Sequence, residues 1–336
     1  MLLFMDGFDH AAGADGASAL LQKWSAGVSA HSLVASPVRT GTGALQGLGS
    51  GNFLATKTFA ASGGFVVGLA VRLTSSPTGI DLLQVREDTT VHLVVGTESG
   101  KLVVRRGASL LATGATTLLI NSWYYVEFKG VIHDTAGSYE LRIDGVTELA
   151  ASGIDTRNVG TTGQWNNVRL GSVASTGVFF DDLYVCDLSG SLRNDFLGVC
   201  KVETLLPQLG NGSNVGLTPS TGGDHGALVD ENPPNTTDYN SSPTVGVKDT
   251  YNYPSMALTG AILGIQTNLY VNKSDAAARQ VCAVVRAGAI DYDGANVAPG
   301  TTFGYFSEVR AVNPNTTVDW TTSDIAALEA GMKVTV

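Results

Sequence analysis

Carboxylates are the first groups in this sequence that could do chemistry. A glycosidase needs two of them, one on each side of the glycosidic bond. On a strand, such an enzyme would carry a run of the form Glu-x-Asp-x-x-Glu, and the sequence contains none. Glu127, Glu140, Asp144 and Glu148 have the spacing of ordinary outward-facing strand positions. The acids therefore predict that the protein is not an enzyme and has no catalytic residues.

A second group of acids could bind calcium. Asp6 and Asp9 lie near the start of the chain, and Asp181 and Asp182 lie in a later apolar segment. Calcium takes six to eight oxygen ligands, largely from carboxylates and carbonyls. The alternative is that these acids only cap a turn and a strand edge. No other cofactor is expected, because the five histidines and three cysteines lack the spacing of a zinc site.

One tryptophan could form a platform for a sugar. Trp165 follows Gln164 and precedes Asn166 and Asn167 in a segment that begins with glycine. An exposed indole can stack on a pyranose face, and the neighbouring amides could bind its hydroxyl groups. This predicts a glycan site at these four residues. The alternative is that Trp165 packs over the edge of a sheet.

The amino-acid composition limits which secondary-structure elements can position these side chains. Charged residues make up 15% of the 336 residues, the net charge is −10, and there are 41 glycines. Such a chain has too few Glu, Lys and Arg for exposed helix faces and too many aliphatic residues for disorder. The negative charge excludes nucleic acid as a partner, and no apolar run reaches the ~20 residues of a membrane span. The first residues lack the basic region of a secretory signal.

Alternating apolar residues between turn signals predict strands in residues 1–190. The expected strands are 65–73, 81–86, 91–96, 101–105, 123–129, 139–146, 168–171 and 178–185. Many short strands at close spacing favour an antiparallel sandwich.

Residues 191–336 predict a second domain of β-sandwich type. Strands are expected at 199–206, 257–271, 280–286 and 304–310, with one short helix at 323–330. A polar arm at about 208–250 is long for a connection within a compact domain, so we expect it to lie across a neighbouring subunit. The fold class predicted for the whole chain is therefore all-β, with two jelly-roll-like β-sandwich domains and one short C-terminal helix.

The order of four segments resembles a known fold. Asp6-Gly7-Phe8-Asp9 comes first, a Trp-led strand follows at 123–128, and a strand at 141–145 ends in an Asp-Gly turn. The segment Phe180-Asp181-Asp182-Leu183-Tyr184-Val185 closes the series. This succession is similar to the concanavalin A-like, laminin-G-type jelly roll, and it covers residues 1–190.

A longer succession of blocks resembles a family of structural proteins in tailed-bacteriophage virions. It runs from 180–185 through 194–198, 202–205, 229–234, 238–242 and 247–251 to 320–334. The resemblance implies a structural role on a virion, after synthesis in the cytoplasm of the host bacterium. It favours a tail fibre or tail-associated adhesin, with copies of itself, other virion proteins and a host surface glycan as partners.

Three other functions stay open. The first is a capsid decoration protein. The second, from a different class, is a polysaccharide-degrading enzyme, which the missing carboxylate pair disfavours. The third is a free carbohydrate-binding module, which the missing secretory signal disfavours.

Overall fold

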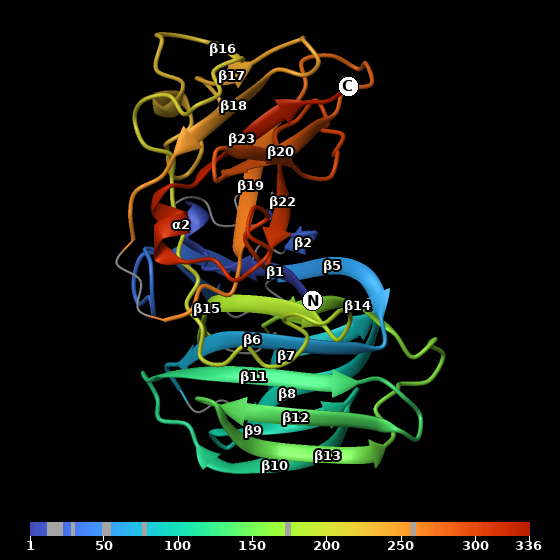
Figure 1. Cartoon of the computed structure of the whole chain (residues 1–336). Coiled ribbons are helices and arrows are strands. Elements are labelled where there is room, and N and C mark those ends of the chain that lie inside the picture. The colour runs from blue at the N-terminus through green and yellow to red at the C-terminus, as the bar shows by residue number, and fades with distance from the viewer. Residues whose placement is uncertain (12–22, 28–30, 49–54, 76–78, 172–175, 257–259) are drawn as a thin grey trace. The chain divides into compact units, whose positions relative to one another are not determined.

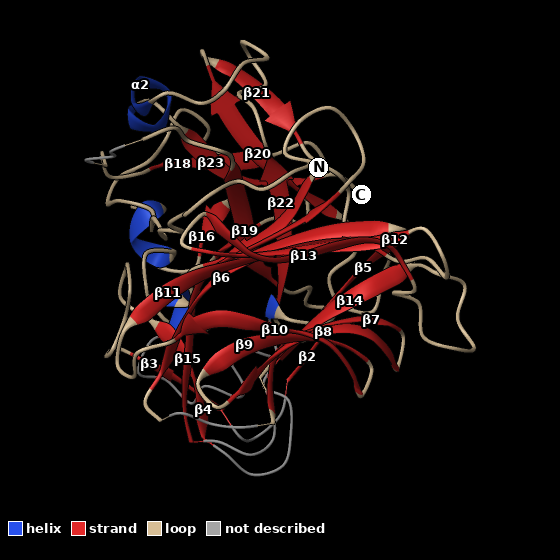
Figure 2. Ribbon diagram, turned by 90° about the horizontal axis from the view of Figure 1, so that it is seen from below, coloured by secondary structure: helices blue, strands red, loops and turns tan. Residues whose placement is uncertain are grey.

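The computed structural model describes the chain except for residues 12–22, 28–30, 49–54, 76–78, 172–175 and 257–259. The chain divides into two compact units, Met1–Glu203 and Thr204–Val336. Almost all regular structure is strand (Figure 2). The all-β prediction with one short helix near the C-terminus is confirmed. No helix within the described ranges has the length and apolar character needed to cross a bilayer.

The first unit is built from two antiparallel sheets. One has the order β13-β12-β11-β6-β15-β4-β3, with β1 beside β15. Its strands are β1 (Leu2–Asp6), β3 (His31–Val34), β4 (Ala44–Leu48), β6 (Gly64–Leu73), β11 (Trp123–Val131), β12 (Gly137–Ile143), β13 (Val146–Ile154) and β15 (Thr176–Asp187). We call it the first sheet. A 3-10 turn, η1 (Asp9–Ala11), follows β1.

The second sheet has the order β10-β9-β8-β7-β14-β5-β2. Its strands are β2 (Ala26–Gly27), β5 (Ala55–Ser62), β7 (Ile80–Glu87), β8 (Thr90–Glu98), β9 (Lys101–Arg106), β10 (Ser109–Thr117) and β14 (Trp165–Leu170). Figure 1 shows β7 to β10 of this sheet as a layer beside β6, β11, β12 and β13 of the first. Sequence periodicity anticipates most of these strands to within a few residues.

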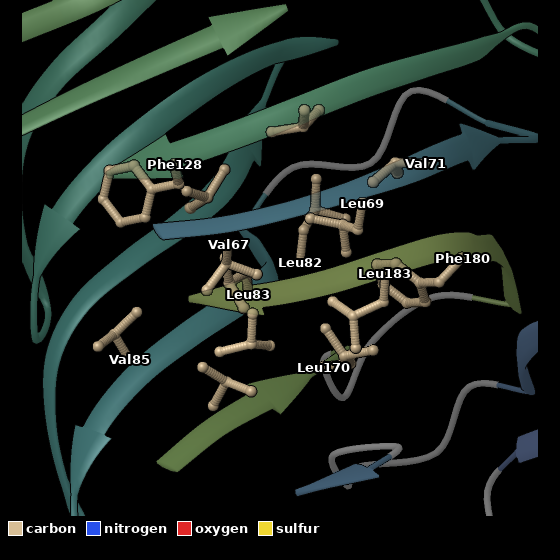
Figure 3. Packing of buried hydrophobic residues seen from close by; sticks show 14 of the residues in the cluster. Val67, Leu69, Val71, Leu82, Leu83, Val85, Phe128, Leu170, Phe180 and Leu183 are labelled. Atoms are coloured by element: carbon tan, nitrogen blue, oxygen red, sulfur yellow. The ribbon is translucent and has the colours of Figure 1, made fainter. Parts of the chain in front are cut away.

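Apolar side chains fill the space between the two sheets. Val67, Leu69 and Phe128 from the first sheet meet Leu83 and Val85 from the second (Figure 3). Every second residue of these strands points into the core, because side chains alternate between the two faces of a strand. The exception is β7, where the register shifts between Asp81 and Leu83 and both Leu82 and Leu83 belong to the core. The residues between them are left on the outer face of each sheet.

The second unit contains three smaller sheets. Four strands have the order β18-β23-β20-β21, and two pairs are β16-β17 and β19-β22. Their bounds are β16 (Thr218–Pro219), β17 (Asn240–Ser241), β18 (Lys248–Asn252), β19 (Ile265–Val271), β20 (Val281–Ala287), β21 (Ile290–Asp293), β22 (Gly304–Arg310) and β23 (Glu329–Val334). Val285, Trp320 and Ile325 belong to one of its apolar clusters.

Three elements predicted for residues 191–336 differ from the structure. The strand expected at 199–206 does not form, because these residues have no regular secondary structure. The helix α2 covers Thr322–Ala326 with Thr321 as its N-cap, so it begins one residue early and ends well before Ala330. The residues after it form β23, which pairs with both β18 and β20, so sheet pairing takes over the end of the expected helix. Of the strand expected at 257–271, only β19 forms, and residues 257–259 lie outside the described residues.

The polar arm is folded onto its own unit. Besides β16 and β17 it carries a 3-10 turn, η2 (Gly226–Leu228). The buried carboxylate of Asp249 accepts hydrogen bonds from Gly216 N at 2.7 Å and Leu217 N at 2.8 Å, and His225 Nδ1 lies 2.6 Å from its other oxygen. Contacts within the chain therefore order this segment.

Candidate functional site

The predicted glycan loop places its tryptophan in the core. Trp165 is the first residue of β14 and has no exposed surface. Its Nε1 donates to Gly64 O at 2.7 Å, and the rings of Phe59 and Phe65 lie 5.6 and 6.1 Å away. The indole is therefore enclosed, and its faces are not available to a sugar in this structure.

The neighbours of Trp165 bond within the protein. Gln164 O accepts from His92 Nε2 at 3.0 Å. Asn166 Nδ2 donates to Asp88 Oδ1 at 2.7 Å, and Asp88 N donates back to Asn166 Oδ1 at 2.8 Å. Asn167 Nδ2 donates to Asn166 Oδ1 at 2.8 Å, and the side chain lies on the outer face of the second sheet.

The structure brings the acids predicted for calcium close together. Asp6 of β1 pairs with Leu183 of β15, the residue after Asp182, and Asp9 begins η1. Asp6 Oδ1 accepts from Lys23 Nζ at 2.9 Å, and Oδ2 accepts from Trp24 Nε1 at 2.7 Å. Burial alone would raise the pKa of Asp6, but Lys23 and His10 outweigh it and hold that pKa far below its usual value. A protein cation therefore occupies this end of the predicted site.

The other predicted acids also bind donors of the protein. Asp9 Oδ1 accepts from Gly43 N at 2.9 Å. Arg39 pairs with Asp182, and Asp181 Oδ2 accepts from Arg39 N at 2.7 Å. Burial and then the charge of Asp182 raise the pKa of Asp181 to about 8. In the described parts of the chain, no three His, Cys, Asp or Glu side chains gather as metal ligands would.

Glu127, expected at an outward-facing strand position, is buried, and so is His92. Glu127 receives hydrogen bonds from Tyr184 Oη at 2.5 Å and Gly198 N at 2.8 Å, because the chain after β15 covers this part of the first sheet. His92 is also fully buried: its Nδ1 accepts from Asn158 N at 3.0 Å, and burial lowers the pKa of the ring. Sequence alternation identifies the outward face for Glu127 but not the segment that covers it.

The outer face of the second sheet gathers polar side chains, of which the sequence analysis singles out Asn167 alone. Asn167 of β14 is directly opposite Arg86 of β7, and Arg169 is opposite Gln84. Opposed residues of an antiparallel pair point to the same face. Val85 and Val168 alternate with them and lie in the core, so these four polar residues lie together on the outer side. We call Gln84, Arg86, Asn167 and Arg169 the polar quartet.

The next strands extend this polar surface. Gln84 is opposite Val94 of β8, which is opposite Arg105 of β9. Arg105 pairs with Asp81, and Gln84 Nε2 donates to the other oxygen of Asp81 at 2.6 Å. A Cβ on Gly96 would lie 2.6 Å from Arg105 Nη2, so glycine at this position makes room for the guanidinium.

Three atoms of the quartet are buried without a hydrogen-bond partner. They are Gln84 Oε1, Arg86 Nε and Asn167 Oδ1, on side chains that are only 5%, 6% and 4% exposed. An unsatisfied buried polar atom costs about 1–3 kcal/mol, and such atoms are rare in folded proteins. Three on adjacent residues of one sheet face make this face the candidate site. Because the atoms are covered, a molecule could complete their hydrogen bonds only after the surrounding side chains move.

The unpartnered atoms define the chemistry of that molecule. Two amide oxygens need donors, and a guanidinium N–H needs an acceptor. Arg86 Nη2 already donates to Thr89 O at 2.7 Å, and Asn167 Nδ2 donates to Asp88 O at 3.0 Å, so both side chains are held in position. A molecule with several hydroxyl groups and at least one acceptor oxygen would satisfy the set.

Comparison with known proteins gives structural neighbours but no family. No family model matches the chain, and no curated protein matches it. Among solved structures, an endo-β-1,4-glucuronan lyase from the fungus Trichoderma reesei is similar at 16% identity and a TM-score of 0.37, over 46% of this chain and 85% of the lyase. The alginate lyase Aly36B is similar at 10% identity and a TM-score of 0.31, over 44% of this chain and 82% of that one.

A sialidase from Trypanosoma rangeli is also similar, at 15% identity and a TM-score of 0.35. The match covers 46% of this chain but only 26% of the sialidase. At these identities and TM-scores the likeness assigns no activity or substrate to this chain.

These comparisons correct one part of the sequence interpretation. The neighbours found are sugar-processing enzymes, which contradicts the prediction of a non-enzymatic tail fibre or adhesin, and that prediction is withdrawn. The missing carboxylate pair on which it rested excludes only one kind of sugar chemistry. The resemblance to virion proteins and the predicted virion partners stay predictions.

Proposed function

We propose that the first unit binds a polysaccharide on the outer face of its second sheet, at the polar quartet. The observation that carries the proposal is the set of three buried, unpartnered atoms, Gln84 Oε1, Arg86 Nε and Asn167 Oδ1. Sugar hydroxyl groups both donate and accept hydrogen bonds, so one sugar can satisfy all three atoms. The strands hold these side chains on a rigid surface, which reduces the entropy lost on binding.

Binding of the full-length chain to neutral and acidic polysaccharides, measured by isothermal titration calorimetry, tests the proposal. The variant Gln84→Leu removes one amide oxygen, and a neutral hydrogen bond is worth about 0.5–1.5 kcal/mol. We therefore expect affinity to fall by about two- to tenfold. Gln46→Leu is the matched control, because Gln46 lies in β4 of the first sheet.

Thermal unfolding of both variants shows whether they are folded. The proposal fails if no polysaccharide binds. It also fails if a folded Gln84→Leu protein binds as tightly as the wild type.

A second candidate function is cleavage of the bound polysaccharide. Asp81 places a carboxylate on the same face, where it accepts a hydrogen bond from Gln84 of the quartet. A carboxylate beside a bound sugar can act as a general base or acid. Release of shortened sugars by the wild type, but not by Asp81→Asn, would support cleavage. Equal release by both proteins would exclude a role for Asp81.

A further inference from the structure

The outer face of the first sheet carries a pocket of about 350 Å³. Its floor spans β11, β12 and β13, which lie side by side in Figure 1. The pocket is on the opposite sheet from the polar quartet, so it is a separate place where a molecule could bind.

The pairing of these strands explains why the face is hollow. Tyr139 of β12 points into the core, so its neighbours on the strand point outward. Opposed residues of an antiparallel pair share a face. The floor therefore consists of two rows, one of Lys129, Glu140 and Ala150 and the other of Val131, Ser138 and Ser152. Three of these six side chains are small, and they leave the space that the longer ones surround.

Leu188 forms an apolar wall of the pocket, and it belongs to the chain that leaves β15. A Cβ on Gly64 would lie 2.4 Å from Leu188 Cδ1, so glycine at this position lets the leucine lie against the sheet. Gly64 is opposite Val131, which places the leucine beside the second row. An apolar wall next to a polar floor is the usual composition of a site for a small molecule.

The charge of Lys129 is balanced within the protein. Its Nζ donates to Asp195 Oδ1 at 2.8 Å and lies 4.7 Å from the centre of the Phe196 ring. The side chain is nevertheless 29% exposed. An ammonium group has three N–H donors, so Lys129 keeps donors for a ligand after it has bonded to Asp195.

The charge of Glu140 is balanced in the same way. Its Oε1 accepts from Arg142 Nε at 2.8 Å and from Thr147 Oγ1 at 2.7 Å. Burial alone would raise the pKa of Glu140, but the hydrogen bonds from Thr147 and Arg142 outweigh it and lower that pKa. The side chain is 23% exposed, and Oε2 takes no part in these bonds. The ionised carboxylate therefore keeps an acceptor for a ligand.

Two hydroxyl groups complete the set. Ser138 and Ser152 are opposite one another, and neither hydroxyl bonds to any other described residue. Ser152 is exposed and Ser138 is half-buried, so both can be reached from solvent. The polar atoms of the quartet, by contrast, are covered.

These groups favour a neutral ligand rich in hydroxyl groups. An anion would have to compete with Asp195 for Lys129, and a cation would have to compete with Arg142 for Glu140. A hydroxyl group both donates and accepts, so it can bond to the serines, the ammonium and the carboxylate without displacing any partner. The volume is near the lower end of the range of about 300–1,000 Å³ for ligand pockets, which suits one sugar ring.

We propose that this pocket binds a single neutral sugar residue, either a free sugar or the end of a chain. Its hydroxyl groups bond to Ser138, Ser152 and Glu140, and its C–H groups contact Leu188. The proposal does not depend on the polar quartet, because the two sites are on different sheets and share no residue.

Binding of the full-length chain to sugars of different charge tests the proposal. The neutral probes are glucose, galactose, mannose and their linear oligosaccharides, and the charged probes are glucuronic acid, galacturonic acid and glucosamine. Saturation-transfer NMR detects binding, and calorimetric titration gives the affinity. We expect at least one neutral sugar to bind, and to bind more tightly than its charged counterpart.

Two variants of Ser138 locate the site. Ser138→Ala removes one neutral hydrogen bond and should lower the affinity about two- to tenfold. Ser138→Leu also fills the floor and should lower the affinity by more than about tenfold. Ser109→Ala and Ser109→Leu are the matched controls, because Ser109 is an exposed serine of β10 in the second sheet, and they should bind as the wild type does. Thermal unfolding shows whether each variant is folded.

The proposal fails if no neutral sugar binds, or if both folded Ser138 variants bind it as tightly as the wild type. A charged sugar that binds more tightly than its neutral counterpart overturns the assignment of a neutral ligand. If Gln84→Leu removes the binding and neither Ser138 variant weakens it, the sugar lies at the quartet and this site is excluded. An oligosaccharide that binds more tightly than its monosaccharide supports the end of a chain as the ligand, and equal affinity supports the free sugar.

Discussion

Replacing Arg86 by methionine should make the unliganded protein more stable. If Arg86 is held for a ligand, its guanidinium is a cost in the free protein, because it is buried beside Arg169 and leaves Nε unsatisfied. Methionine keeps an unbranched apolar stem in the same space and removes the charge. A side chain that is present for folding would show the opposite effect.

The magnitude follows from the contacts of the side chain. Removing the unsatisfied Nε recovers about 1–3 kcal/mol. The substitution also removes the bond from Arg86 Nη2 to Thr89 O. Thr89 is exposed, so water can replace that donor and the loss is small. We expect a net gain of about 1–2 kcal/mol in unfolding free energy, which raises the Tm of a unit of this size by about 2–8 °C.

Differential scanning calorimetry without ligand measures this change. Arg105→Met is the matched control, because it leaves the partly buried carboxylate of Asp81 without its cation and should lower the Tm. A lower Tm for Arg86→Met, of the size seen for Arg105→Met, would refute the reasoning and make Arg86 a structural residue.

Three further predictions concern the rest of the chain. Trp165→Ala should lower the unfolding free energy by about 3–5 kcal/mol in chemical denaturation, because it empties a fully buried site and leaves Gly64 O without its donor. Burial lowers the pKa of Lys57 to about 8. The unfolded chain then binds more protons between about pH 8 and 10.5, so stability contributed by this group should rise with pH in that window, and Lys57→Met should abolish the rise. Thr321→Ala removes the capping box formed with Asp324 and should cost about 1 kcal/mol, whereas Thr321→Ser should cost little.

The strands of the first unit could be predicted because they depend on local alternation. Residues 65–73, 123–129 and 178–185 alternate or run apolar in sequence, and they form β6, β11 and β15. The sequence predicts a helix that extends to residue 330, whereas Glu329 and Ala330 belong to β23. Their pairing with β18 and β20 depends on strands that are distant in the sequence. The local sequence pattern therefore predicts whether an element is a helix or a strand more reliably than the residue at which the element ends.

The candidate site could not be predicted from the sequence, although Gln84, Arg86 and Arg169 lie within predicted strands and Asn167 directly precedes one. Gln84 and Arg86 alternate with Leu83 and Val85, which marks them as belonging to one face of β7. That they lie beside Asn167 and Arg169 depends on the pairing of β7 with β14, some 80 positions apart along the chain. The sequence does show polar residues at alternate positions of an otherwise apolar strand. Without knowledge of the pairing between β7 and β14, these positions cannot be told from ordinary surface positions.

Asp6 and the quartet differ in how their buried polar atoms are satisfied, and the difference bears on function. Asp6 is surrounded by donors from Phe8 N, Lys23 and Trp24, which is what a structural role requires. The quartet instead keeps both amide oxygens and Arg86 Nε unsatisfied while equally removed from solvent. Folding alone gains nothing from the second arrangement, because apolar residues of similar size would avoid its cost. A bound molecule that supplies the missing partners accounts for the cost, and this contrast is the reason to place the ligand on the second sheet instead of at Asp6.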